Sequence, residues 1–222
     1  MRHIDRLNIP EVLNRNHAKW QADFNAKKAA NPQARPDSSK YAHKDIRKQL
    51  MSMSHNKCFY CEGMLLDRPK EVDHYVEVAV DHSKAFDWNN LYMACLNCND
   101  KVPHNTIPVS AALNPILDSD ADIKTHISFD KEIIFPMPGS LKGKQTITKF
   151  RLDTDLLNAQ RRDWIIKIDG IIIDILKKMV AEGRQSFSDE ELSVINRFMD
   201  SASPFSLMSE VYIKRKLHGL LP

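Results

Sequence analysis

The feature that most constrains this chain is a cysteine spacing that occurs twice. The four cysteines of the 222-residue sequence form two Cys-x-x-Cys pairs, Cys58–Cys61 and Cys95–Cys98. A Cys-x-x-Cys turn places both sulfur atoms on one side of a tight loop, and two such loops supply the four thiolates that Zn²⁺ prefers. Because four cysteine ligands leave no open coordination position, the spacing predicts a structural zinc ion.

Metal binding is a better interpretation of these cysteines than disulfide bonds. The first residues, MRHIDRLNIP, contain no apolar run of the signal-peptide type. The most apolar segment, 164–176, contains three charged residues and a glycine, so it cannot cross a bilayer. We therefore expect a cytoplasmic protein that does not contact a membrane, and in that compartment paired cysteines are typical metal ligands.

The segment between the two pairs is longer than in a minimal zinc ribbon and contains its own polar motif. Residues 71–78, EVDHYVEV, alternate apolar and polar side chains as a strand does, with Asp73 and His74 side by side. Zinc would hold this strand against the residues after Cys95, which we expect to form a short helix carrying Asn99. A carboxylate, an imidazole and an amide would thus meet in one place.

These residue types suit metal-assisted cleavage of phosphodiester bonds. Mg²⁺ or Mn²⁺ takes oxygen ligands and retains water, so one or two protein ligands are enough. Asp73 and Asn99 are the predicted ligands, and His104, five residues later, could replace or assist Asn99. His74 is the predicted general base, because an ordinary imidazole titrates near neutral pH.

The same residues carry a resemblance to a known family. EVDHYVEV and WNNLYMACLNCNDK, bracketed by the two Cys-x-x-Cys pairs, resemble the HNH endonucleases and their ββα-metal fold. By position the motif residues are His74, Asn90 and Asn99, the H-N-N variant. The resemblance implies that His74 is the base, that Asn90 holds the loop bearing it, and that Asp73 and Asn99 bind the catalytic ion.

A wider stretch, about 40–165, is similar to the PtuB family, the HNH subunits of Septu anti-phage systems that are also found with retrons. CFYCE, ALNP and TITKFRLDTDLLNAQRRD add to this likeness. The resemblance implies an ATPase partner of the PtuA type and cleavage of phage or host nucleic acid, either DNA or RNA. The competing interpretation is a non-catalytic zinc adaptor that binds nucleic acid or a protein partner.

The net charge of +3 conceals an uneven distribution. Residues 1–57 hold twelve Lys and Arg against five Asp and Glu, whereas residues 58–134 hold six against thirteen. A nucleic-acid surface needs clustered basic side chains, although a solvated helix face has the same composition. The candidates are Lys27, Lys28, Arg35, Lys40, Lys44, Arg47 and Lys48.

Taken together, the patterns predict an α+β protein, a mainly helical chain around a ββα-metal module stapled by the four-cysteine zinc site. We expect a basic helical segment at 1–57, the zinc-stapled HNH module at 58–135, and a mostly helical region at 136–222 that contributes core and partner interface. Helices are predicted at 10–30, 39–55 and 154–182, with Ser188 capping another. The 154–182 helix is so apolar that we expect it to be buried on more than one side, with any excess forming an interface.

Overall fold

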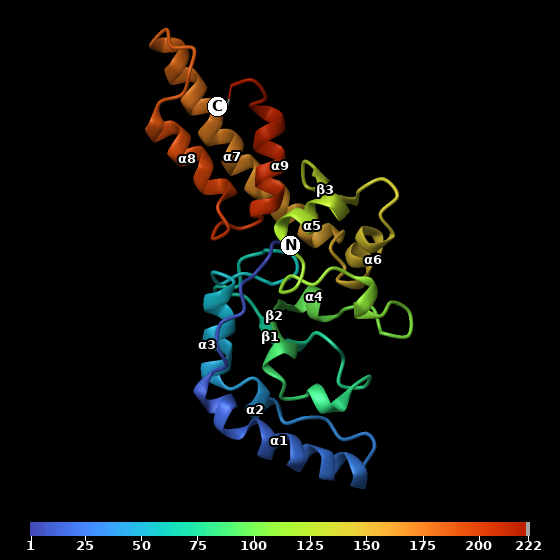
Figure 1. Cartoon of the computed structure of the whole chain (residues 1–222). Coiled ribbons are helices and arrows are strands. Elements are labelled where there is room, and N and C mark those ends of the chain that lie inside the picture. The colour runs from blue at the N-terminus through green and yellow to red at the C-terminus, as the bar shows by residue number, and fades with distance from the viewer. Residues whose placement is uncertain (221–222) are drawn as a thin grey trace.

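The computed structural model describes residues 1–220 and shows helices around two small sheets (Figure 1). The elements in chain order are α1 (Glu11–Ala30), α2 (Ser38–Tyr41), α3 (Lys44–Met53), β1 (Lys70–His74), η1 (His82–Lys84), η2 (Trp88–Asn90), β2 (Leu91–Cys95), α4 (Leu96–Asn99), η3 (Val109–Ala111), α5 (Asp120–His126), β3 (Ile127–Asp130), β4 (Ile133–Pro136), α6 (Leu141–Lys149), α7 (Asp155–Ala181), α8 (Asp189–Met199) and α9 (Ser206–Lys216), where η marks a 3-10 helix. The predicted fold class, α+β, is confirmed.

The centre of the molecule is an antiparallel pair of strands followed at once by a helix. β1 pairs with β2 in the register that sets Lys70 opposite Cys95 and His74 opposite Leu91. α4 begins at the residue after β2 and packs on both strands. This is the ββα arrangement that the motif predicts. Figure 1 shows it between α1–α3 at one end of the molecule and α7–α9 at the other.

Two local predictions in the N-terminal half need correction. The helix predicted over 39–55 is broken into α2 and α3, because His43 has an extended backbone and its Nδ1 accepts a hydrogen bond from the amide of Asp45. The strand predicted over 71–78 ends at His74. Beyond it, the amides of Tyr75 and Val76 donate to the backbone and side-chain oxygens of Asn90, which replace the ladder.

The segment before β3 is helical. Ile123, at an even spacing from Ile127 and Phe129 that would also suit the alternation of a strand, lies in α5. A capping box in which Ser119 and Asp122 each bond the other's backbone amide starts this helix, and it prevails over the alternation. Ile127 and Phe129 do point inward from β3.

Two apolar clusters form the core. The larger contains cysteines and strand residues of the central ββα unit together with side chains from the N-terminal helices, such as Leu13, Ile46 and Leu50. The smaller joins α7, α8 and α9 through residues such as Ile168 and Ile195. Trp164 and Tyr212 pack against both clusters, so the C-terminal helices are anchored to the centre of the molecule.

The long C-terminal helix is less buried than its composition predicts. α7 spans Asp155–Ala181, close to the predicted bounds, and the Ser188 capping box precedes α8 as expected. One side of α7 is buried, but Ile166, Ile173 and Val180 are exposed, so burial on more than one side is wrong. Among the described residues, no helix combines the length and apolarity needed to cross a membrane.

Close packing of α6 against the end of α5 yields a first test. A Cβ added at Gly143 would lie 1.9 Å from the carbonyl oxygen of His126, so Gly143→Ala forces backbone to move. We expect the variant to lose about 2 kcal/mol or more of stability, measured by chemical denaturation. Lys144→Ala, on the exposed side of the same helix, is the control and should be nearly neutral. Equal stability of the two variants would contradict this packing.

Candidate metal centre and active site

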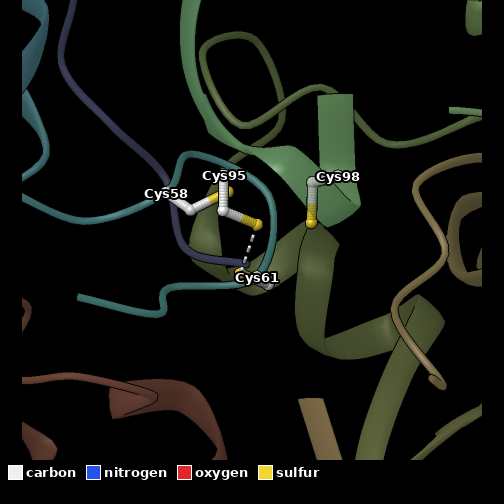
Figure 2. Close-up of side chains that lie close together, drawn as sticks. All are labelled: Cys58, Cys61, Cys95 and Cys98. Carbon is white, nitrogen blue, oxygen red and sulfur yellow. Dashed lines mark hydrogen bonds between the residues drawn. The ribbon is translucent and has the colours of Figure 1, made fainter. Parts of the chain in front are cut away.

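The four cysteines meet in one cluster, as the spacing predicts (Figure 2). Cys58 and Cys61 lie in the turn after α3, Cys95 ends β2, and Cys98 lies in α4. All four sulfur atoms are within 4.8 Å of one another, and those of Cys61 and Cys95 are 3.8 Å apart. A tetrahedron with Zn–S bonds of about 2.3 Å has sulfur–sulfur edges of about 3.8 Å. The cluster therefore has the donor set and the dimensions of a four-thiolate zinc site.

Backbone hydrogen bonds shape the first cysteine turn. The amide of Cys58 donates to the carbonyl of Gly63 at 2.9 Å, and the amide of Gly63 donates to the sulfur of Cys61 at 3.4 Å. Glu62 takes a left-handed backbone conformation with φ of 62°, which closes the turn. The amide of Phe59 donates to the carbonyl of Met93 and so attaches this turn to β2.

The pKa values of the thiols indicate that the cluster would need a cation to become fully ionised. Burial raises the pKa of the Cys58 and Cys98 thiols, whereas hydrogen bonds from neighbouring thiols, that of Cys58 first, lower the pKa of Cys95. Four sulfur atoms this close cannot all ionise unless a metal ion offsets their charge.

Arg161 of α7 lies beside this cluster and, among the described residues, has no carboxylate partner. Its side chain is 1% exposed, and it donates one hydrogen bond, to Asn158, while its Nε has no partner among the described residues. Burial lowers the pKa of this guanidinium, and the nearby Cys61 and Cys98 act in the opposite direction. Four thiolates on a divalent ion carry a net charge of −2, which would supply the missing negative charge.

Asp73 is buried on the face of β1 that α4 covers, and its carboxylate already has a cation. Nζ of Lys101 is 2.9 Å from both carboxylate oxygens, and the hydroxyl of Tyr60 donates to one of them at 2.6 Å. The same ammonium donates to the carbonyls of His74 and Tyr75. Lys101 is thus an internal counter-ion with a side chain 6% exposed.

His74 points to the other side of β1. Its Nε2 lies 2.9 Å from the carbonyl oxygen of Ala85, and its ring packs against Tyr41 with the centroids 4.6 Å apart. A carbonyl only accepts hydrogen bonds, so Nε2 carries the proton and the lone pair lies on Nδ1. Burial lowers the pKa of His74, which keeps the imidazole in the neutral form that a general base requires.

Asn90 braces the loop around His74. Its side chain is buried, donates to the carbonyls of Val76 and Lys84, and accepts from the amide of Val76. The chain leaving β1 is thereby tied to the residue before Ala85, whose carbonyl holds His74. The geometry suits the positioning role that the resemblance implies for Asn90.

The two alternatives for the last ion ligand lie in different surroundings. Asn99 donates to the carboxylate of Glu71 at 2.6 Å, on the same face of β1 as Asp73, and within residues 1–220 it makes no hydrogen bond to Asp73. Nδ1 of His104 is 3.8 Å from an oxygen of Glu77, whose other oxygen accepts from Lys149. The structure therefore groups Asn99 with the Asp73 face and His104 with a separate ion pair.

Sequence reasoning missed several partners of these residues. Tyr60 and Lys101 hold Asp73, Glu71 holds Asn99, and Tyr41 packs on His74. The position of Glu71 could have been predicted, because it lies two residues before Asp73 and strand alternation puts both side chains on the same face. Tyr41 comes from a helix far away in the sequence, and no pattern in the residues around it predicts its contact with His74.

Comparison with known proteins finds similar sequences for this arrangement. Residues 58–104 match the family model described as HNH endonuclease, the family that the motif residues resemble. The chain is similar to the Septu protein PtuB of Bacillus thuringiensis, 29% identical over 156 residues, covering 69% of this chain and 55% of that protein. It is also similar to the Septu protein PtuB of Bacillus mycoides (strain KBAB4), 25% identical over 153 residues, covering 54% of this chain and 51% of that protein. The chain spans about half the length of these curated relatives.

The position of Arg161 leads to a test of the metal centre. Arg161→Met keeps much of the volume but removes the positive charge beside the thiolates. We expect zinc affinity, measured by competition with a chromogenic chelator, to fall by roughly 10–100-fold. Arg162→Met, at the exposed neighbouring position, should leave the affinity unchanged. Equal zinc affinities of the two variants would show that Arg161 does not sense the charge of the cluster.

Proposed function

We propose that this protein is a metal-dependent HNH endonuclease that hydrolyses phosphodiester bonds of nucleic acid, DNA or RNA. The observation that carries the proposal is the orientation of His74, whose imidazole is held by the Ala85 carbonyl next to a loop braced by Asn90. A histidine fixed in one tautomer beside a buried aspartate, within a matched HNH segment, is suited to catalysis.

In this proposal the two neighbouring side chains of β1 have different tasks. Nδ1 of His74 accepts a proton from the attacking water, and Asn90 maintains the loop that orients the ring. Asp73 and Asn99 would hold Mg²⁺ or Mn²⁺, which when bound stabilises negative charge on the phosphoryl group and leaving oxygen. The four cysteines would hold Zn²⁺ and keep the strands and α4 together.

Lys101 adds a condition to this mechanism. Its ammonium occupies the oxygen atoms of Asp73, so a divalent ion could bind Asp73 only after Lys101 moves away. The oxygen atoms of Asp73 and Asn99 are the kind of ligand that a hard ion prefers. When no divalent ion is bound, the ion pair with Lys101 neutralises the charge of Asp73. Lys101 then becomes available to contact a phosphate.

The basic N-terminal segment supplies a path for the substrate. Tyr41, which packs on His74, is close enough to sense the charges of Arg47 and Arg35 as well as that of Glu71, and both arginines are exposed. Positive side chains at the approach to the base would bind the phosphate backbone without reading sequence.

The similarity to PtuB supports a defence role for the proposed nuclease. We include in the proposal that the protein is a cytoplasmic nuclease effector of an anti-phage complex and acts with an ATPase partner of the PtuA type. A second function, a non-catalytic zinc adaptor, is favoured by one observation: Lys101 already satisfies Asp73. Cleavage assays separate the two functions.

The base can be tested by one substitution. His74→Ala should lower cleavage of DNA or RNA with Mg²⁺ or Mn²⁺ by ~100-fold or more, because the attacking water loses its proton acceptor. Zinc content and melting temperature should stay near those of the parent.

Assays of the chain alone and with a PtuA-type ATPase cover both modes of action. His82→Ala, at an exposed histidine, is the matched control and should cut normally. If the parent cuts and His74→Ala cuts equally fast, His74 is not the base. If the parent never cuts, the adaptor function is preferred.

The Lys101–Asp73 pair makes a separate prediction about stability. Lys101→Met leaves a buried carboxylate without a cation and should cost about 3 kcal/mol in the absence of divalent ions. Mn²⁺ should then raise the melting temperature of the variant more than that of the parent, because the ion can take the vacated position. Lys214→Met, which breaks an exposed pair with Glu210, should change little. A variant indifferent to Mn²⁺ would argue against Asp73 as an ion ligand.

A further inference from the structure

One side of α7 is apolar and faces solvent. Ile166 is 63% exposed, Ile173 is 45% exposed and Val180 is 81% exposed. They are seven residues apart, so they form one line along the helix. α8 and α9 pack on a different side of α7, where Ile168 and Ile172 are buried (Figure 1). The chain itself therefore leaves this line uncovered.

Three more residues alternate with these apolar positions. Asp163, Gly170 and Lys177 are also seven residues apart and fall three or four residues from the isoleucines. The combined spacing of four and three is that of a seam between two packed helices. We name this face the α7 stripe; it consists of Asp163, Ile166, Gly170, Ile173, Lys177 and Val180.

The two charges of the α7 stripe differ from those charges of the same helix that are already paired. Arg162 pairs with Glu132 at 3.0 Å, and Asp169 pairs with Lys216 at 2.7 Å. Asp163 and Lys177 are exposed and have no ion-pair partner within residues 1–220. An acid and a base of opposite sign thus lie seven residues before and seven residues after the glycine.

We infer that the α7 stripe binds the α7 stripe of a second copy of this chain, with the two helices antiparallel and crossing at Gly170. In a twofold pairing, positions equally distant from the centre face each other. Asp163 of one copy then faces Lys177 of the other, and the same pair forms a second time. The charges of the α7 stripe are therefore complementary to those of an identical stripe that runs in the opposite direction.

Gly170 provides the space for the crossing. A Cβ placed there would meet nothing within 4 Å, so the surface is open at this point. Without side chains at the centre, two helix backbones can approach closely, and Ile166 and Ile173 of each copy can pack beside the partner's glycine. Glycine in the middle of a helix costs stability relative to alanine, and a close approach is a physical reason for its presence.

Charge reversal tests the pairing directly. The mass of the full chain in solution is measured by sedimentation equilibrium, and we expect a dimer. Asp163→Lys alone sets lysine against lysine twice, and Lys177→Asp alone sets aspartate against aspartate twice. Each single variant should weaken the dimer by roughly tenfold or more, and the double variant should restore it. Lys178→Asp, one residue off the stripe, should leave the dimer intact.

Several results would overturn the inference. A monomeric parent, or single reversals that dimerise like the parent, would exclude it. Failure of the double variant to recover would exclude the antiparallel pairing. If the parent is monomeric and Ile166→Ser with Ile173→Ser abolishes binding to a PtuA-type ATPase, then the stripe belongs to a different protein. Zinc content and unfolding of each variant confirm that the chain remains folded.

Discussion

The structure depends on the convergence of four cysteine side chains from two separate turns. One pair comes from the turn after α3 and the other from the junction of β2 and α4, and their sulfur atoms lie within 4.8 Å. A two-stranded hairpin with a four-residue helix has too little apolar area to be stable alone. A metal ion bound by the four cysteines would join the two segments and, together with the surrounding helices, would give this small unit a fixed geometry.

This fixed geometry is what allows neighbouring residues of β1 to have opposite surroundings. Asp73 faces α4 and is enclosed by Tyr60 and Lys101, whereas His74 faces Tyr41 and the loop that Asn90 braces. A carboxylate held by a cation and an imidazole kept neutral by burial are a suitable start for hydrolysis. Exchange of the Lys101 ammonium for a divalent ion would change the surroundings of Asp73 and would also release the His74 carbonyl, while the Ala85 carbonyl could still hold the imidazole.

Sequence patterns predicted those parts of the molecule that local chemistry determines. The cysteine spacing predicted the cluster, the capping box at Ser188 predicted the start of α8, and the motif predicted the ββα order. Contacts between segments far apart in the sequence could not be predicted, because no periodic pattern of residues indicates them. The burial of Lys101 against Asp73 is one case, and the position of Arg161 beside the thiols is another.

The exposed side of α7 is another feature that the sequence alone did not predict. Composition suggested a helix buried on more than one side, yet α8 and α9 cover only part of it. Hydrophobic content alone does not say whether the cover comes from the same chain or from another molecule.

The most direct test of the central claim is anomalous diffraction from crystals of the full chain grown with Mn²⁺. The account predicts a zinc peak among the four sulfur atoms and a manganese peak bound to Asp73, with the Lys101 ammonium displaced. The same map would show whether the second ligand is Asn99 or His104. Lys101 still paired with Asp73 at saturating Mn²⁺, with no manganese peak nearby, would contradict the proposed active site.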